Sequence, residues 1–279
     1  MSHYRMRLPE GWYPHDKQSC IRTIEEKIEN FKIKSKNKRA GIVPHAGWYF
    51  SGQLTAHVLK TLKENNPNPD RICLIGGHLG SYHPVFYLDF EKAETPLGDI
   101  GFDSKLTNQI IKHFPDSKKD HNTGDNTIEV SLPMIKYFFP ETPLIAFRAP
   151  PSSLALELGK KIKEIALKND QNIIVIGASD LTHYGVNYGF APYGTGEKAV
   201  KWVKEENDKR LIHDILAGNL ENIPSRSLKE QSSCSGGTIA SVCAFAKYFD
   251  DYTPEIIDYY TSSDIILSDN FVGYVGITF

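Results

Sequence analysis

The chain has 279 residues, of which 40% are hydrophobic and 24% charged, and both values are ordinary for a globular protein. Its 32 basic and 34 acidic residues give a net charge of −2, so the composition does not indicate a nucleic-acid-binding protein. The basic run at residues 32–39 is the local exception, and it is more typical of a solvated connection than of a binding patch.

The first half of the chain alternates helical and strand-like apolar patterns. Apolar residues three or four positions apart predict helices at residues 18–31, 53–63 and 104–114. Short apolar runs predict strands at residues 39–43, 71–75 and 85–90. Another helical pattern opens at residues 125–129 and carries Pro133 early, where a missing backbone donor is best tolerated.

The second half continues the alternation. Strands are predicted at residues 144–147, 172–176, 255–260 and 271–278, and helices to about Lys168, to Gly218 and through Tyr248. Alternating strands and helices predict an α/β fold, a three-layer α/β/α sandwich around a mixed sheet of about seven strands. The sequence contains no linker-like break and no long repeat, which favours a single domain over residues 1–279.

Polar groups follow three of the predicted strands and precede one helix. These groups are His45, His78, the pair Asp180 and His183, and Cys234. Neighbouring strands lie about 5 Å apart, so groups at their carboxyl ends can converge on one point. Imidazoles and a thiolate suit Fe(II), Cu or Zn rather than Mg or Ca. An acid near an imidazole can orient it and raise its pKa, which equips His183 for proton transfer beside Asp180.

Several short motifs extend this pattern over nearly the whole chain: Trp12-Tyr13-Pro14, Pro44-His45-Ala46-Gly47 with Ser51-Gly52, Gly76 to His78, Thr127-Ile128-Glu129 with Leu132-Pro133, Ser179-Asp180 with His183 and Gly185, and Cys234. In this order they resemble the MEMO family, whose bacterial and archaeal members are called AmmeMemoRadiSam system protein B. That family is similar in fold to the LigB-type class III extradiol dioxygenases, so the resemblance implies a LigB-dioxygenase-like fold.

The resemblance also implies roles for individual residues. The LigB-type enzymes hold Fe(II) with two histidines and a glutamate, and His45 and His78 correspond to these histidines. Cys234 stands where the MEMO family replaces the glutamate with cysteine. Asp180 and His183 correspond to the remaining pocket residues, with His183 at the acid/base position. Fe(II) or Cu is therefore the expected ion, and Zn is the alternative.

Two positions depart from the family's pattern. Members commonly carry a histidine where this chain has Asn126, and the second ligand motif usually reads Gly-Pro followed by a small polar residue and histidine. Here that motif is Gly76-Gly77-His78, so His83 competes with His78 for the second ligand role. His78 is favoured because it is adjacent to the strand end.

The roles of several other residues stay open at this point. Glu129 can line the pocket or simply begin a helix, where a carboxylate interacts favourably with the helix dipole. The aromatic residues that follow the key histidines, Trp48, Tyr49, Tyr184 and Tyr188, can form the wall of a pocket for a flat or apolar substrate or can be packing residues.

The leading hypothesis is a metal-dependent oxidoreductase with a dioxygenase-like site. The alternatives are a module that binds a peptide or partner protein in the same pocket, and a zinc hydrolase. The family name implies an AMMECR-type protein and a radical-SAM enzyme as partners, whereas nucleic acid and membrane are not expected. The first 14 residues carry no apolar core of the kind a secretion signal has, no apolar segment approaches the length that crosses a membrane, and the four cysteines form no CxxC pair. We therefore expect a cytoplasmic protein with reduced thiols.

Overall fold

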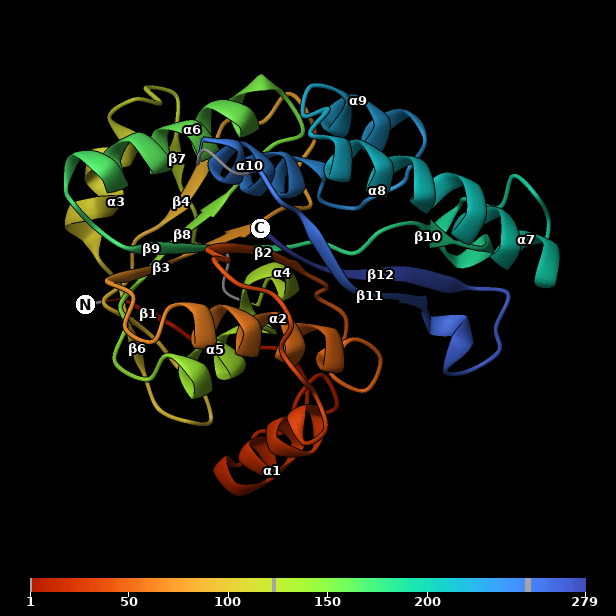
Figure 1. Cartoon of the computed structure of the whole chain (residues 1–279), viewed down its shortest axis with the longest axis horizontal. Helices are drawn as coiled ribbons and strands as arrows, with labels where there is room; N and C mark the ends of the chain where they lie inside the picture. The colour runs from red at the N-terminus through yellow and green to blue at the C-terminus, as the bar shows by residue number, and fades with distance from the viewer. Residues whose placement is uncertain (1, 122–123, 249–251) are drawn as a thin grey trace.

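A large sheet runs through the middle of the molecule and helices cover both of its faces (Figure 1). The computed structural model describes residues 2–121, 124–248 and 252–279. The strand order is β10-β12-β2-β9-β3-β8-β4-β7, with β11 paired to β12. These strands are β2 (Ala40–Val43), β3 (Arg71–Gly76), β4 (Phe86–Leu88), β7 (Lys118–Lys119), β8 (Leu144–Arg148), β9 (Ile173–Ala178), β10 (His183–Tyr184), β11 (Glu255–Thr261) and β12 (Phe271–Thr278).

The central strands β2, β9, β3 and β8 are mutually parallel, whereas β12 and β4 flank them in antiparallel orientation. A second, small sheet joins β1 (His3–Tyr4), β5 (Lys92–Ala93) and β6 (Ile100–Gly101). Because the four central strands are parallel, their carboxyl ends meet at one edge of the sheet, where ligands bind in open α/β folds.

Side chains of the central strands alternate between two cores. In β3, Cys73 and Ile75 face one core while Ile72 and Leu74 face the other, as the two-residue period of a strand requires. The first core lies under α3 (Ser104–Ile111), α6 (Ser153–Lys168), α8 (Asp208–Ala217), α9 (Asn222–Lys229) and α10 (Gly236–Lys247). The second lies under α1 (Lys17–Ile28), α2 (Gly52–Asn65), α4 (Asn126–Glu129) and α5 (Leu132–Phe138). This arrangement confirms the predicted three-layer sandwich.

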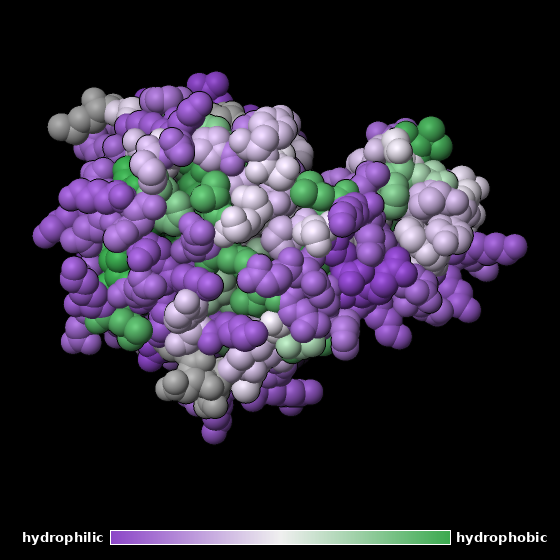
Figure 2. All heavy atoms as spheres, turned by 90° about the horizontal axis from the view of Figure 1, so that it is seen from above, coloured by the Kyte–Doolittle hydropathy of each residue, from purple (hydrophilic) through white to green (hydrophobic). Residues whose placement is uncertain are grey.

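The end of the molecule that carries α7 (Glu197–Trp202) and β10 projects from the body. Seen from above, the surface is mostly hydrophilic, with small hydrophobic patches scattered over the body and one at the projecting end (Figure 2). Exposed large apolar residues occur in this part of the chain and in the connection between β11 and β12, among them Val186, Tyr193 and Leu267.

The structure differs from the sequence prediction in three respects. The main sheet has nine strands among the described residues rather than about seven, because two-residue strands such as β7 and β10 are too short to show an alternating pattern. The helix predicted from residue 125 onward breaks at Val130 and Ser131 and restarts as α5, where Pro133 lies in the first turn and lacks the N–H that a continuous helix needs. Helix α9 was not predicted.

Gly159 is a point of close approach between α6 and α10. A β-carbon there would lie 2.0 Å from the Ser241 carbonyl oxygen, a backbone atom that cannot move without shifting α10. We predict that Gly159→Ala lowers the free energy of unfolding by about 1–3 kcal/mol, the usual cost of overpacking, in urea denaturation. Gly101→Ala is the control, because nothing lies within 4 Å of its added β-carbon. Equal stability of the two variants would contradict this account of the packing.

Candidate metal centre

The candidate site lies at the carboxyl edge of the sheet, where the sequence placed it. His45 follows β2 after Pro44, and His78 follows β3 after Gly77. Asp180 follows β9, and the parallel pairing of these three strands brings the three residues to the same edge. Cys234 comes from the loop before α10, so it is the tertiary packing of that loop that brings it close to the strand ends.

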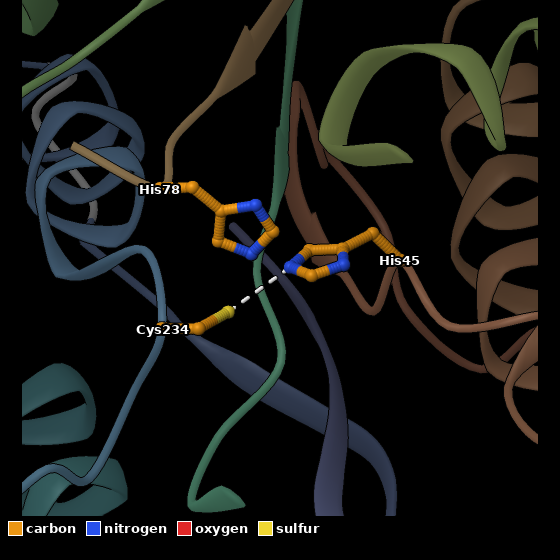
Figure 3. Close-up of side chains that lie close together, drawn as sticks. All are labelled: His45, His78 and Cys234. Atoms are coloured by element: carbon orange, nitrogen blue, oxygen red, sulfur yellow. Dashed lines mark hydrogen bonds between the residues drawn. The ribbon is translucent and has the colours of Figure 1, made fainter. Parts of the chain in front are cut away.

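His45, His78 and Cys234 converge on one point (Figure 3). Each offers one ligand atom, and these atoms all lie within 4.8 Å of one another. Nε2 of His45 lies 3.0 Å from the Cys234 sulfur, and the two imidazole rings meet edge to face with centroids 4.8 Å apart. The predicted convergence is therefore confirmed, and a donor set of two imidazoles and a thiolate fits Fe, Cu or Zn.

The backbone at His78 aims its ring toward the cluster. His78 has a φ of 61°, in the left-handed region that residues with side chains adopt infrequently. Its N–H donates to Oγ of Ser235, the residue after Cys234, at 3.2 Å. His83, the competing candidate, uses Nδ1 to accept from the Gly80 N–H at 2.9 Å and lies outside the ligand cluster formed by the described residues.

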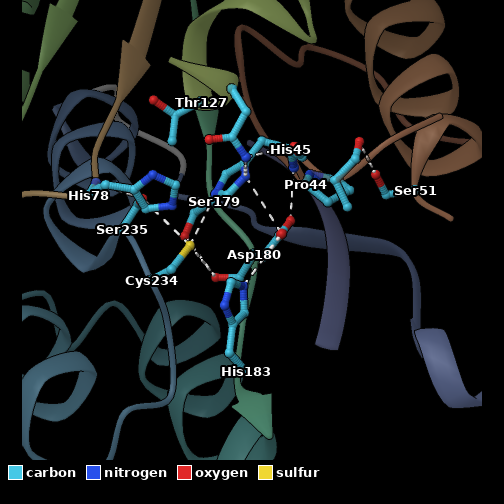
Figure 4. Close-up of polar contacts among 12 residues, drawn as sticks. Pro44, His45, Ser51, His78, Thr127, Ser179, Asp180, His183, Cys234 and Ser235 are labelled. Atoms are coloured by element: carbon cyan, nitrogen blue, oxygen red, sulfur yellow. Dashed lines mark hydrogen bonds and ion pairs between the residues drawn. The ribbon is translucent and has the colours of Figure 1, made fainter. Parts of the chain in front are cut away.

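Asp180 joins the strand ends to the cysteine loop (Figure 4). Its Oδ1 accepts from the backbone N–H of His45 at 2.8 Å, and its backbone oxygen lies 3.4 Å from the donating N–H of Cys234. Its Oδ2 lies 3.6 Å from both Nδ1 of His45 and Nε2 of His183. Nε2 of His183 is buried without a hydrogen-bond partner among the described residues, so it can interact with a bound molecule.

Opposing charges determine the protonation of this cluster. Burial disfavours the charged form of His45, but Asp180 and the Cys234 thiolate outweigh it and raise its pKa to about 9. Burial likewise opposes the ionised form of Cys234, yet the neighbouring His45, His183 and His78 hold the pKa of its thiol well below the ordinary value. Burial also opposes protonation of His183, and the same two acidic groups raise its pKa to about 10. Without a metal, the cysteine is therefore a thiolate between imidazolium rings.

Asn126 contacts the Nδ1 side of the His45 ring. Its Nδ2 lies 3.0 Å from Nδ1 of His45. When His45 is doubly protonated, or binds an ion through Nε2, Nδ1 carries a proton and needs an acceptor. Oδ2 of Asp180, 3.6 Å from Nδ1, is placed to accept that proton. Asn126 thus occupies the position at which the sequence departs from the family's motif, and it contacts a candidate ligand directly.

A pocket of about 730 Å³ opens above the cluster. His45, His78, Asp180 and His183 line it together with Asn126. Its remaining wall is largely aromatic and apolar, and includes Trp12, Tyr49, Phe50, Tyr188, Ile266 and Tyr274. Of these, the side chain of Tyr49 is 65% exposed, so the aromatic wall extends to the surface.

Four residues that the sequence offered as pocket candidates are not among the described residues that line this pocket: Glu129, His83, Trp48 and Tyr184. Oε1 of buried Glu129 accepts from the Tyr13 hydroxyl and from two backbone N–H groups of the N-terminal segment. Trp48 donates its indole N–H to the Val130 carbonyl, and the Tyr184 hydroxyl donates to the Gly194 carbonyl. The named groups of Trp48 and Tyr184 are thus satisfied within the fold, whereas Oε2 of Glu129 is buried without a hydrogen-bond partner among the described residues.

Residues 5–278 match the family described as Memo-like protein. The chain belongs to this family. Relatives include a MEMO1 family protein from Thermococcus onnurineus, which is 28% identical and aligned over 96% of each chain, and one from Pyrococcus furiosus, 29% identical over 95% of each. The crystal structure of the uncharacterised protein JW3007 from Escherichia coli K12 is similar with a TM-score of 0.55, covering 87% of this chain and 99% of that chain. At 12% identity, it supports the fold alone.

Among the residues that the structure describes, no helix is long and apolar enough to cross a membrane. The described cysteines are all free, as the sequence predicted.

We predict that Cys234 of the metal-free protein is alkylated by iodoacetamide even in mildly acidic buffer, because the thiolate is the nucleophile and its pKa is lowered. The other cysteines, Cys20, Cys73 and Cys243, are buried with raised pKa values and should not react. In His45→Gln, the charge that most lowers the thiol's pKa is removed, so the rate profile should move to higher pH.

The measurement is the pH dependence of alkylation, followed by mass spectrometry. His57→Gln is the matched control, because His57 stacks on Phe31 away from the cluster. An identical pH profile for His45→Gln and His57→Gln would show that His45 does not stabilise the thiolate.

Proposed function

We propose that this protein is a metal-dependent oxidoreductase whose ion, Fe or Cu, is held by His45, His78 and Cys234. The observation that carries the proposal is the convergence of their three ligand atoms within 4.8 Å of one another, at a point where His45 and His78 line a pocket. Such an ion supplies redox chemistry when bound, and a thiolate among the ligands favours Fe, Cu or Zn over hard cations.

The three candidate ligands differ in how deeply they are buried. His45 is buried, Cys234 is partly buried and His78 is exposed. Three protein ligands leave coordination positions for a substrate, as in catalytic rather than structural metal sites. A substrate in the pocket therefore has access to the site from the side of His78, while His45 is held from behind by Asp180 and Asn126.

Two residues beside the ligands are placed for proton transfer. His183 lines the pocket, and its buried Nε2 has no hydrogen-bond partner among the described residues. Asp180 orients it from 3.6 Å. The thiolate and carboxylate that raise the pKa of His183 include the proposed ligand Cys234. A cation held by Cys234 would offset the part of this effect that comes from the thiolate and so lower the pKa of His183, while Asp180 would remain beside the ring.

The aromatic wall favours a second candidate function, the binding of an apolar group from a peptide or partner protein. Tyr49 and Tyr188 line the pocket and are 65% and 45% exposed, and exposed aromatic groups of this kind are common at binding surfaces. Metal content after purification without chelators separates the two functions. Zinc as the only bound metal would favour hydrolytic over redox chemistry.

The cellular setting is likewise part of the proposal. We infer a cytoplasmic protein that works with an AMMECR-type protein and a radical-SAM enzyme, on the strength of the family to which the chain belongs. Co-purification of the three proteins tests this inference.

We predict that Cys234→Ser loses most of its bound iron or copper while remaining folded, because a hydroxyl is a poor replacement for a thiolate toward these ions. Metal analysis after purification measures the loss. His83→Gln is the control, since His83 neighbours the site in sequence but lies outside the ligand cluster of the described residues. Unchanged metal content in Cys234→Ser would remove Cys234 from the ligand set.

We predict that His183→Gln retains the metal and the fold but loses turnover, because glutamine remains polar and cannot transfer a proton. Asp180→Asn should have a milder effect, since asparagine keeps an oxygen that can accept from the His45 N–H and loses only the orienting charge. Metal analysis tests the first half directly, and turnover tests the second. Loss of metal in His183→Gln would make His183 a ligand and overturn the assigned roles.

A further inference from the structure

Arg148, the last residue of β8, lies beneath the loops that carry two site residues. Its Nε and Nη2 donate to the Gly77 carbonyl at 3.1 and 2.8 Å. The same guanidinium contacts Asp120 through Nη1 and Asp125 through Nη2, each at 2.8 Å. Its side chain is 11% exposed, so these contacts are formed in the interior. Arg148 does not line the pocket described above and lies outside the ligand cluster of the described residues.

The contact with Gly77 constrains His78. Both polar backbone groups of Gly77 are hydrogen-bonded. Its carbonyl accepts from Arg148, and its N–H donates to Oγ1 of Thr127 at 3.2 Å. The next residue, His78, has the left-handed backbone at a φ of 61°. A strained conformation persists only when its surroundings determine it. The hydrogen bonds at Gly77 help to hold the backbone of the next residue, the candidate ligand His78, in this conformation.

The contact with Asp125 constrains His45. Oδ1 of Asp125 accepts from the N–H and the hydroxyl of Thr127, while its Oδ2 faces Arg148. Asn126, held between Asp125 and Thr127, contacts Nδ1 of His45 at 3.0 Å. One guanidinium is therefore linked to His78 through Gly77 and to the His45 ring through Asp125 and Asn126.

We propose that Arg148 is a positioning residue of the metal centre, which sets the His78 and His45 imidazoles at the separation that metal binding needs. The inference rests on the proposed metal-binding function. Its geometry requires a planar fork, because three nitrogens in one plane make four contacts to three different groups, the Gly77 carbonyl and two carboxylates. A lysine offers a single ammonium nitrogen and cannot reproduce them.

A purely structural role is the competing explanation. Buried ion pairs contribute little net stability, because removing the charges from water offsets their attraction. The chain offers a matched pair for comparison: Arg71, at the start of β3, donates to Asp103 at 2.6 Å and is likewise partly buried. Arg71 lies at the opposite end of the strand that leads to His78. If ion pairing alone matters, Arg71→Lys and Arg148→Lys should behave alike.

The test compares the two lysine variants of the full chain in Co(II) binding, with chelator competition for affinity and visible absorption for ligand geometry. We expect Arg148→Lys to weaken Co(II) binding by about 10- to 100-fold, the usual effect of losing an outer-shell contact, and to change the thiolate-to-cobalt absorption. Arg71→Lys should match the unsubstituted protein in both. Unchanged affinity and spectrum in Arg148→Lys, or equal losses in both variants, would overturn the proposal.

A crystal structure of metal-free Arg148→Lys provides a readout that does not depend on metal binding. We expect the His78 ring to move away from Cys234 and the φ of His78 to leave the left-handed region. An unchanged cluster would refute the positioning role. If the unsubstituted protein binds no Co(II), the proposed metal-dependent function fails, and this structural comparison still decides whether Arg148 sets the ring positions.

Discussion

The Asp180 carboxylate is the constraint on which the site depends. It is 3% exposed and has one oxygen on the His45 backbone and the other facing two imidazoles. Its own backbone oxygen receives the N–H of Cys234. An ionised carboxylate in the interior is costly unless donors and cations surround it. Asp180 therefore requires the end of β2, the end of β9 and the loop before α10 to stay together.

The need of buried negative charge for nearby positive charge also explains why the cluster can accept a cation. Two acidic groups, Asp180 and Cys234, lie among three imidazoles, and each raised histidine pKa reflects the negative charge around it. In the metal-free site, protons on His45 and His183 balance that charge. A cation held by His45 and the thiolate would displace the proton of His45, so metal binding would be coupled to proton release and favoured at higher pH.

The sequence predicted the parts of this structure that depend on local pattern. The apolar runs before His45, His78 and Asp180 each form a buried strand, and the parallel arrangement brings their ends to one edge. Cys234 was offered as the polar group before a predicted helix and matched to a ligand position through the family resemblance, and the structure brings its sulfur to 3.0 Å from Nε2 of His45. The strands β7 and β10, two residues each, leave no detectable period.

What the sequence did not predict depends on contacts between distant segments. Glu129 starts a helix in sequence, but its role is decided by Tyr13 and the N-terminal backbone more than a hundred residues away. Arg148 ends an ordinary apolar strand, and only the folded chain shows that it reaches Gly77 and Asp125. Side chains at strand ends can be found from local pattern, whereas the groups that hold them in place cannot, because their partners come from other elements.

The candidate ligands and the pocket wall stand on different kinds of structure. The ligand positions stand on β2, β3 and the start of α10, which pack into two buried cores, and packed cores resist displacement. The pocket wall above them draws on Tyr49 in a turn, on Tyr188 at the end of the short 3-10 helix η1 (Val186–Tyr188) and on Ile266 in the connection between β11 and β12. Loops tolerate substitution far better than cores do. The fold thus separates a fixed base, which carries the three candidate ligands, from a wall whose loop residues are freer to change.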